Sequence, residues 1–149
     1  MDYVKKMRTW IGHEPLLLVG AAVLILQEGK LLMLRRTDNH AWGLPGGALE
    51  PGERLQETAH RETLEETGLE TGTLTLFDIF SGPELYYRYP NGDEVFNVSV
   101  VYLAEDVQGE LRLNPEEHSE YRHFELKELP QDISPPIKIV LECLTKKCA

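Results

Sequence analysis

GGALEPGERLQETAHRETLEETGL, residues 46–69, is the stretch that decides how this chain folds. The Gly46-Gly47 pair interrupts regular structure and lets the backbone come close to a ligand. Residues 50–53 contain a Pro-Gly step and are predicted to form a turn. Residues 54–67 have no Gly or Pro and favour a helix, which Gly68 is expected to end with a left-handed cap. The stretch is therefore predicted to be a loop, a helix and a helix stop.

Acidic side chains crowd one side of the predicted helix. Glu62, Glu65 and Glu66 fall within an arc of roughly 100°, and Glu62 and Glu66 form a like-charge i,i+4 pair that weakens an isolated helix. Arg61 lies between Glu57 and Glu65 at i,i+4 spacing and offsets part of this repulsion. The remaining excess of carboxylates suits a bound divalent cation, Mg²⁺ or Mn²⁺, although a solvated acidic face is the commoner explanation of a Glu-rich helix.

The spacing of these residues resembles the signature of the Nudix hydrolase family. Residues 42–46, Trp-Gly-Leu-Pro-Gly, are also similar to the segment that usually precedes the signature. One position departs from it, since Thr63 stands where an aliphatic residue is commoner. The fixed charged and glycine positions of the signature are filled across residues 47–69 by Gly47, Glu53, Arg61, Glu62, Glu65, Glu66, Gly68 and Leu69.

The resemblance implies a metal site and a role for each of these residues. Arg61 would orient the carboxylates, and Glu53 would be an outer ligand that often acts through water. The resemblance implies one more acidic ligand from a late loop, for which we choose Glu117, with Glu116 and Glu120 as alternatives. The direct ligands of Mg²⁺ or Mn²⁺ would be the carboxylates of Glu62, Glu65 and Glu66 and the carbonyl of Gly47.

The resemblance also implies the reaction. It predicts metal-dependent hydrolysis of the pyrophosphate linkage in a nucleoside diphosphate joined to another moiety, as in ADP-ribose, a dinucleoside polyphosphate or an NTP-like substrate. Glu62 or Glu117 would take the proton from the attacking water. Some domains that resemble the family bind nucleotides without cleaving them, so a nucleotide sensor or regulatory domain is the alternative. This chain retains every carboxylate of the signature, which favours an enzyme over a sensor or regulatory domain.

Candidate substrate contacts lie outside the signature. Arg35 and Arg36 end a predicted strand near the acidic loop, and a guanidinium matches phosphate geometry, although a surface ion pair is the alternative. Trp42 could stack on a base or pack in the core. Tyr86 and Tyr87 could form a stacking platform for a nucleobase or pack across strands.

Length and composition are those of one globular domain, residues 1–149, and the resemblance implies a small-molecule nucleotide as its substrate. The formal net charge of −10 argues against nucleic acid or an anionic membrane surface as a partner. The longest apolar run, residues 15–26, is too short to span a membrane, and no secretory signal is seen at the N-terminus, so a cytoplasmic location is expected. Cys143 and Cys148 are five residues apart on a predicted helix, which argues against a disulfide.

The order of predicted elements indicates an α+β domain with α/β/α layers, and the resemblance implies a mixed sheet between helices. Residues 2–11 are predicted to be a short amphipathic helix that forms a lid over the sheet, and dimerisation through this segment or a sheet edge is a further hypothesis. Residues 16–27 are predicted to be a strand buried on both faces. A last helix is expected from Pro135, with an apolar stripe at Ile137, Val140, Leu141 and Leu144. The other predicted strands are residues 31–36, 74–80, 85–89, 95–104, 109–113 and 121–126.

Overall fold

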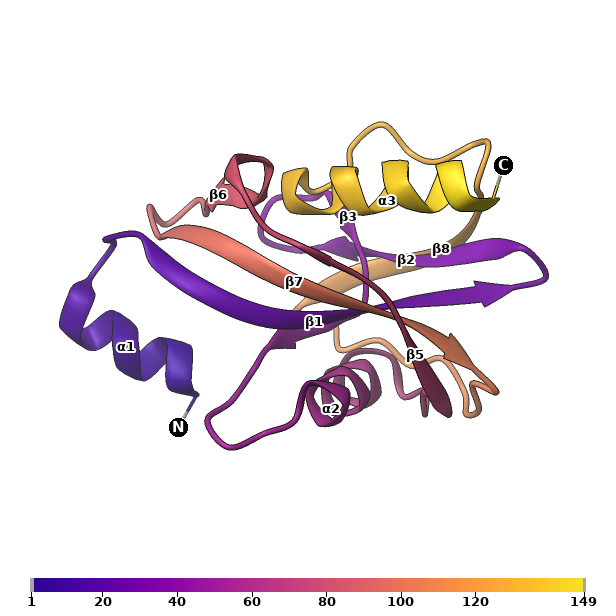
Figure 1. Cartoon of the computed structure of the whole chain (residues 1–149), viewed down its shortest axis with the longest axis horizontal. Helices are drawn as coiled ribbons and strands as arrows, with labels where there is room; N and C mark the ends of the chain where they lie inside the picture. The colour runs from indigo at the N-terminus through magenta and orange to yellow at the C-terminus, as the bar shows by residue number, and fades with distance from the viewer. Residues whose placement is uncertain (1, 149) are drawn as a thin grey trace.

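Strand β1 (Leu16–Gln27) is the centre of the architecture, because it is the middle strand of the main path through the sheet. The computed structural model describes residues 2–148, and Figure 1 shows how its elements are arranged. The helices are α1 (Tyr3–Ile11), α2 (Leu55–Thr67), α3 (Pro135–Cys148) and the short 3₁₀ helix η1 (Pro83–Leu85). The remaining strands are β2 (Lys30–Arg36), β3 (Trp42–Gly43), β4 (Gly46–Ala48), β5 (Thr73–Phe80), β6 (Tyr86–Arg88), β7 (Glu94–Glu105) and β8 (His118–Glu125).

The sheet is mixed. Its main path runs β3-β2-β1-β7-β5, and β4, β6 and β8 pair with β1, β7 and β2. Strands β1 and β7 are parallel over ten residue pairs, from Leu16 opposite Val95 to Ile25 opposite Ala104. The other pairings between named strands are antiparallel. The predicted mixed sheet is therefore confirmed.

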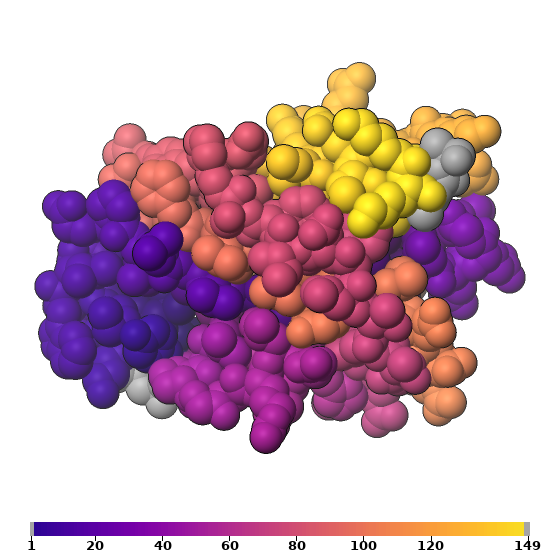
Figure 2. All heavy atoms as spheres, in the orientation of Figure 1, coloured from indigo at the N-terminus to yellow at the C-terminus, as the bar shows by residue number. Residues whose placement is uncertain are grey.

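Helices cover the two faces of the sheet, and each face has its own apolar core. One core contains Ala59 of α2 together with Val23 of β1 and Val100 of β7. The other contains Leu24 of β1 and the predicted stripe of α3, of which Val140 and Leu144 are at most 1% exposed. Figure 1 shows α3 above the sheet and α2 below it, and Figure 2 shows the yellow surface of α3 and the magenta surface of α2 on either side of the sheet. The predicted α/β/α layering is confirmed.

Helix α1 forms as predicted, but it is not a lid over the sheet. Asp2 caps it by accepting a hydrogen bond from the backbone N–H of Val4 at 2.9 Å, and none of its residues is buried. Arg8 fastens it to the start of β7 by donating to the carbonyl of Glu94 at 2.7 Å. The helix lies beside the sheet in Figure 1 and leaves Trp10 71% exposed. The apolar stripe of α1, formed by Val4, Met7 and Ile11, is only half-buried, so the helix packs at the edge of the sheet (Figure 1) and does not cover a face as the lid prediction expected.

Three strand predictions also need correction. Only residues 21–25 of β1 are buried on both faces, while Leu17 is 76% exposed on the face that α2 covers further along the strand. Residues 109–113 form no strand; instead the N–H of Arg112 donates to the carbonyl of Thr67 at 2.7 Å. The segment thus satisfies a free carbonyl at the end of α2, where a helix leaves its last carbonyls unpaired. The strand predicted at residues 85–89 begins only after η1.

No helix in residues 2–148 is long and apolar enough to cross a membrane.

Two fully buried threonines on α2, Thr63 and Thr67, offer a test of its packing. The hydroxyl of Thr63 has no hydrogen-bond partner among the described residues, whereas that of Thr67 donates to the Thr63 carbonyl at 2.6 Å. A buried hydroxyl without a partner costs about 1–3 kcal/mol, so Thr63→Val should raise the free energy of unfolding by about 1 kcal/mol. Thr67→Val, the matched control, should lower it by about 1 kcal/mol in the same denaturant titration. Equal losses in the free energy of unfolding of both variants would contradict the conclusion that the Thr63 hydroxyl is unpaired.

Candidate active site

A cavity of about 530 Å³ lies where β4, the end of α2 and the start of β8 meet. Glu62 and Glu66 reach it from α2, one helical turn apart. Glu117 and His118 reach it from the opposite side, at the start of β8. Gly47 contributes backbone to its wall. The structure therefore brings four of the predicted metal-site residues to one cavity, together with one residue that was not predicted.

The glycines of β4 allow the carboxylates to lie against the backbone. A Cβ atom on Gly47 would lie 2.7 Å from either carboxylate oxygen of Glu62, so any side chain there would displace Glu62. Gly46 has a φ of +154° and a Cβ atom on it would lie 2.8 Å from the Cα of Ala22 in the paired strand β1. Its N–H donates to Oε1 of Glu66 at 2.8 Å. Residue 47 must therefore be glycine for Glu62 to occupy this space, and residue 46 must be glycine for β4 to pair so closely with β1.

Arg61 holds Glu62 in place and is itself held by Glu53. Its Nε and Nη2 donate to the two oxygens of Glu53 at 2.7 and 3.0 Å, and its Nη1 donates to Glu62 at 2.8 Å. The hydrogen bonds from Arg61 lower the pKa of Glu53 to about 2, aided by the hydroxyl of Thr58. A bidentate guanidinium–carboxylate pair has a well-defined geometry. Glu53 thus orients Arg61 and does not line the cavity, which agrees with its predicted place away from the direct ligands.

Glu66 is a carboxylate with few compensating contacts. It is 5% exposed, and burial raises its pKa well above the ordinary value, with the nearby charges of Glu62 and Glu117 acting in the same direction. Burial also raises the pKa of Glu62, in spite of its bond to Arg61. Taking carboxylates out of water near one another is unfavourable unless a positive charge joins them. The arrangement fits a divalent cation, for which carboxylate oxygens are preferred ligands.

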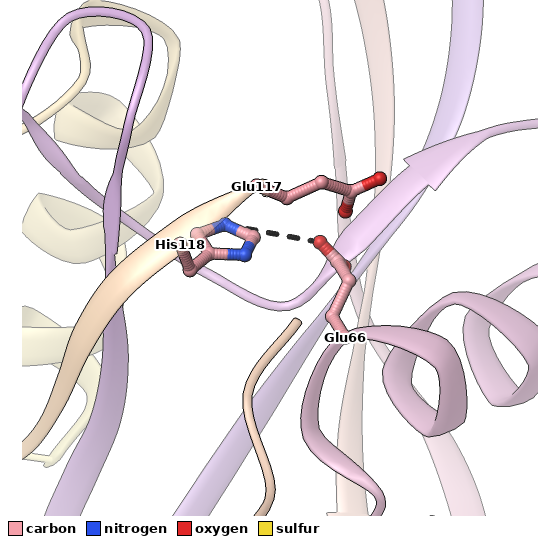
Figure 3. A group of neighbouring side chains, drawn as sticks. All are labelled: Glu66, Glu117 and His118. Atoms are coloured by element: carbon pink, nitrogen blue, oxygen red, sulfur yellow. Dashed lines mark ion pairs between the residues drawn. The ribbon is translucent and has the colours of Figure 1, made fainter. Parts of the chain in front are cut away.

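His118 is the site residue that the sequence analysis missed. It is 5% exposed, and its Nε2 lies 3.9 Å from Oε2 of Glu66, as Figure 3 shows. Burial, and then the nearby charge of Arg36, lower the pKa of His118 to about 4. The imidazole is therefore neutral near pH 7, and the two side chains do not form a charged pair. Glu66, Glu117 and His118 each offer a ligand atom within 4.8 Å of the others, a spacing suited to a metal ion.

The other predicted metal-site carboxylates lie elsewhere. Glu65 has a 59% exposed side chain, lies 3.6 Å from Nη1 of Arg61 and does not line the cavity. It was predicted as a ligand because it shares an arc with Glu62 and Glu66, but its position on the helix turns it towards Arg61 and solvent. Of the alternatives to Glu117, Glu116 lines the cavity, while Glu120 lies 3.5 Å from Arg35 outside it.

Two of the five predicted substrate contacts reach the cavity, namely Arg36 and Tyr87. Arg36 donates two hydrogen bonds to the carboxylate of Asp38, at 2.9 and 2.7 Å, so its guanidinium is held at the cavity wall. Tyr89, the third tyrosine of the strand predicted at residues 85–89, also lines the cavity, and its ring centroid lies 4.8 Å from that of Tyr87. Residues two apart in an extended segment point to one face, which places Tyr87 and Tyr89 together and Tyr86 away from them.

The other three predicted substrate contacts do not line the cavity, and the structure does not support those roles. Trp42 is 4% exposed and packs edge-on against Phe124 in the core beneath α3. Arg35 lies over the Trp42 ring at 5.6 Å and donates to the carbonyl of His40. Tyr86 donates its hydroxyl hydrogen to Glu94 at 2.5 Å, which directs it to strand pairing between β6 and β7. In each case the alternative given from the sequence describes the residue, namely core packing for Trp42, an ion pair with Glu120 at 3.5 Å for Arg35 and cross-strand packing for Tyr86.

Known proteins share both the sequence and the fold of this chain. The sequence profile of the NUDIX domain matches residues 16–143. An ADP-ribose pyrophosphatase of Methanocaldococcus jannaschii is 32% identical over 131 residues, which is 86% of this chain and 71% of that protein. An asymmetrical bis(5′-nucleosyl)-tetraphosphatase of Mus musculus is 38% identical over 105 residues, 68% of each chain. The crystal structure of a MutT NUDIX hydrolase from Burkholderia pseudomallei superposes with a TM-score of 0.73 and 30% identity, covering 88% of this chain and 98% of that one.

These matches span most of the chain and include the β4–α2 segment that carries the acidic cavity. The resemblance drawn from residues 47–69 is thereby confirmed, and the chain belongs to the NUDIX family of hydrolases.

Proposed function

We propose that this protein hydrolyses a pyrophosphate linkage in a nucleoside diphosphate joined to a second moiety, with Mg²⁺ or Mn²⁺ as cofactor. The observation that supports the proposal is the buried carboxylate of Glu66. It lies beside Glu62 and opposite Glu117 in one cavity, and it has no cationic partner of its own among the described residues. Similarity to an ADP-ribose pyrophosphatase and a dinucleoside tetraphosphatase supports the choice of bond.

The carboxylates Glu62, Glu66 and Glu117 and the carbonyl of Gly47 would hold the cation. When bound, such an ion neutralises phosphate oxygens and lowers the pKa of a coordinated water. Glu53 and Arg61 keep Glu62 in position through hydrogen bonds of 2.7 to 3.0 Å, so this ligand does not have to be ordered when substrate arrives.

Glu62 is our candidate for the group that accepts the proton of the attacking water. Burial raises its pKa towards neutrality, which makes it a better proton acceptor than an exposed glutamate. As water attacks one phosphorus of the linkage, its proton passes to Glu62, the bridging P–O bond breaks and a phosphomonoester leaves. Glu117 is the alternative acceptor, since it lines the same cavity from the turn that precedes β8.

The far wall of the cavity would bind the nucleotide. Arg36 presents a guanidinium that Asp38 holds with two hydrogen bonds, and its charge acts on both Glu66 and His118. It is therefore placed to contact a phosphate beside the carboxylates. Tyr87 and Tyr89 offer aromatic surface, and Asn39 donates to the hydroxyl of Tyr87 at 2.5 Å. Such rings commonly stack on a nucleobase.

A substrate panel with product identification tests the proposal. ADP-ribose, a dinucleoside tetraphosphate and an oxidised dNTP would each be incubated with the protein and Mg²⁺ or Mn²⁺. We expect phosphomonoester products from at least one compound and none when the cation is chelated. Tight nucleotide binding without product after long incubation would instead identify a sensor domain.

Replacing the buried carboxylate should abolish catalysis. Glu66→Gln keeps the shape and the hydrogen bond from Gly46 but loses the charge, so kcat should fall by at least ~100-fold. The matched control is Glu57→Gln on the same helix, where the side chain is 57% exposed, pairs with Arg54 and accepts a capping hydrogen bond from the Arg54 N–H that Gln can also accept. The kcat of Glu57→Gln should stay within about twofold of the wild-type value, since an exposed ion pair contributes little to stability. Full activity in Glu66→Gln would rule out the assigned role.

Cation binding should release protons. In the metal-free protein Glu66 stays protonated above its ordinary pKa of 4.5, because burial raises its pKa, and the same holds to a smaller extent for Glu62. A ligand must be ionised, so the apparent affinity for Mn²⁺ should rise as the pH rises from 4.5 through the raised pKa of Glu66. Calorimetric titration in two buffers of different ionisation enthalpy measures the protons released. An affinity that does not change with pH in this window would contradict the prediction.

A further inference from the structure

His118 is an unusual residue for a protein interior. It is 5% exposed, and its Nδ1 is buried with no hydrogen-bond partner among the described residues. Nor is Nε2 within hydrogen-bond distance of the nearest carboxylate oxygen, that of Glu66 at 3.9 Å. Buried side-chain nitrogens in folded proteins almost always have a partner, so an imidazole kept for packing alone would be expected to make at least one hydrogen bond.

The 3.9 Å distance between Nε2 of His118 and Oε2 of Glu66 is the distance expected if both atoms bind one ion. Two ligand atoms that each lie about 2.1 Å from a metal ion can be at most about 4.2 Å apart. The pair is therefore too far apart for a hydrogen bond and close enough to share a cation. A carboxylate oxygen of Glu117 completes a group whose atoms all lie within 4.8 Å of one another, so a small movement of one side chain brings all three into range. Figure 3 shows Glu66 and His118 facing each other from α2 and β8.

The surroundings of His118 favour the form that can bind a metal. Arg36 is the cationic group that acts on the imidazole, and Asp38, which is bonded to Arg36, opposes it. A neutral imidazole has one nitrogen with a free lone pair, which is the form that coordinates metal ions. The side chain is thus a nitrogen donor beside two carboxylates, in a cavity where no other imidazole among the described residues forms part of the lining.

We propose that His118 is a direct nitrogen ligand of the divalent cation bound by Glu66 and Glu117. The proposal rests on the cation binding of the proposed function and goes beyond it, because it adds a ligand of a different chemical type. Imidazole binds Mn²⁺, Co²⁺ and Zn²⁺ better than it binds Mg²⁺, which favours oxygen and water. The site should therefore discriminate against Mg²⁺ more strongly than a site made of carboxylates alone.

Pulsed electron paramagnetic resonance on the full chain loaded with Mn²⁺ tests the proposal without any turnover. The spectrum of the wild-type protein should show the modulation of a directly bound ¹⁴N nucleus. Labelling the protein with ¹⁵N-histidine should replace that coupling with the ¹⁵N pattern, which identifies histidine as the source. His118→Asn should lose the coupling and bind Mn²⁺ about 10-fold more weakly, while its affinity for Mg²⁺ changes less.

The matched control is His123→Gln. His123 lies on the same strand but lines a separate cavity next to residues 25–27, so this variant should keep the nitrogen coupling. The wild-type spectrum shows whether a histidine nitrogen binds Mn²⁺ even if His118→Asn does not fold. Mn²⁺ that binds without nitrogen coupling, or a coupling that survives in folded His118→Asn, would overturn the role of His118 and leave the proposed function standing. If Mn²⁺ does not bind with or without nucleotide, the proposed function fails as well.

Discussion

The close contact between the Gly47 backbone and the Glu62 carboxylate is the constraint on which the site depends. It requires that strand β4 carry no side chain where α2 approaches it, and that β4 be held at that position by pairing with β1. A Cβ atom on Gly20 of β1 would in turn lie 2.8 Å from the Gly47 carbonyl. The backbones of β1 and β4 and the acidic face of α2 thus form one closely packed unit. Glu62 and Glu66 are therefore positioned by a helix that packs against the sheet.

Within that unit the acidic residues divide into two kinds. Glu53 is paired with Arg61 and strongly ionised, and its function is to orient the arginine and, through it, Glu62. Glu66 receives a single backbone N–H from Gly46 and faces other carboxylates. A protein that needed these charges only for packing would be more stable with neutral residues in their place. The cost of burying Glu66 is explained if the cavity gains a cation, because the same desolvation strengthens each interaction with that ion.

The sequence was sufficient for the local parts of the fold and of the site. The helix over residues 55–67, its cap at Gly68 and the convergence of Glu62 and Glu66 follow from short-range spacing, which a helix converts directly into geometry. Burial that depends on tertiary contacts could not be predicted from the sequence in the same way. Trp42 belongs to the core under α3, and His118 belongs to the cavity, because of contacts made by strands far away in the chain. The neighbouring Glu117 was found only because the resemblance to a family called for an acidic residue there.

The division between local and distant contributions also explains why the substrate is harder to infer than the reaction. The groups proposed to act on the phosphoric anhydride come mainly from β4 and α2, which are adjacent in the chain. The groups that would contact the nucleotide come from separate elements, with Arg36 at the end of β2, Tyr87 on β6 and Tyr89 just after it. These positions can change without disturbing the packing of β1, β4 and α2. Under the proposed function, the reaction would therefore stay the same while the opposite wall of the cavity, which here includes Arg36, Tyr87 and Tyr89, would select the molecule that carries the bond.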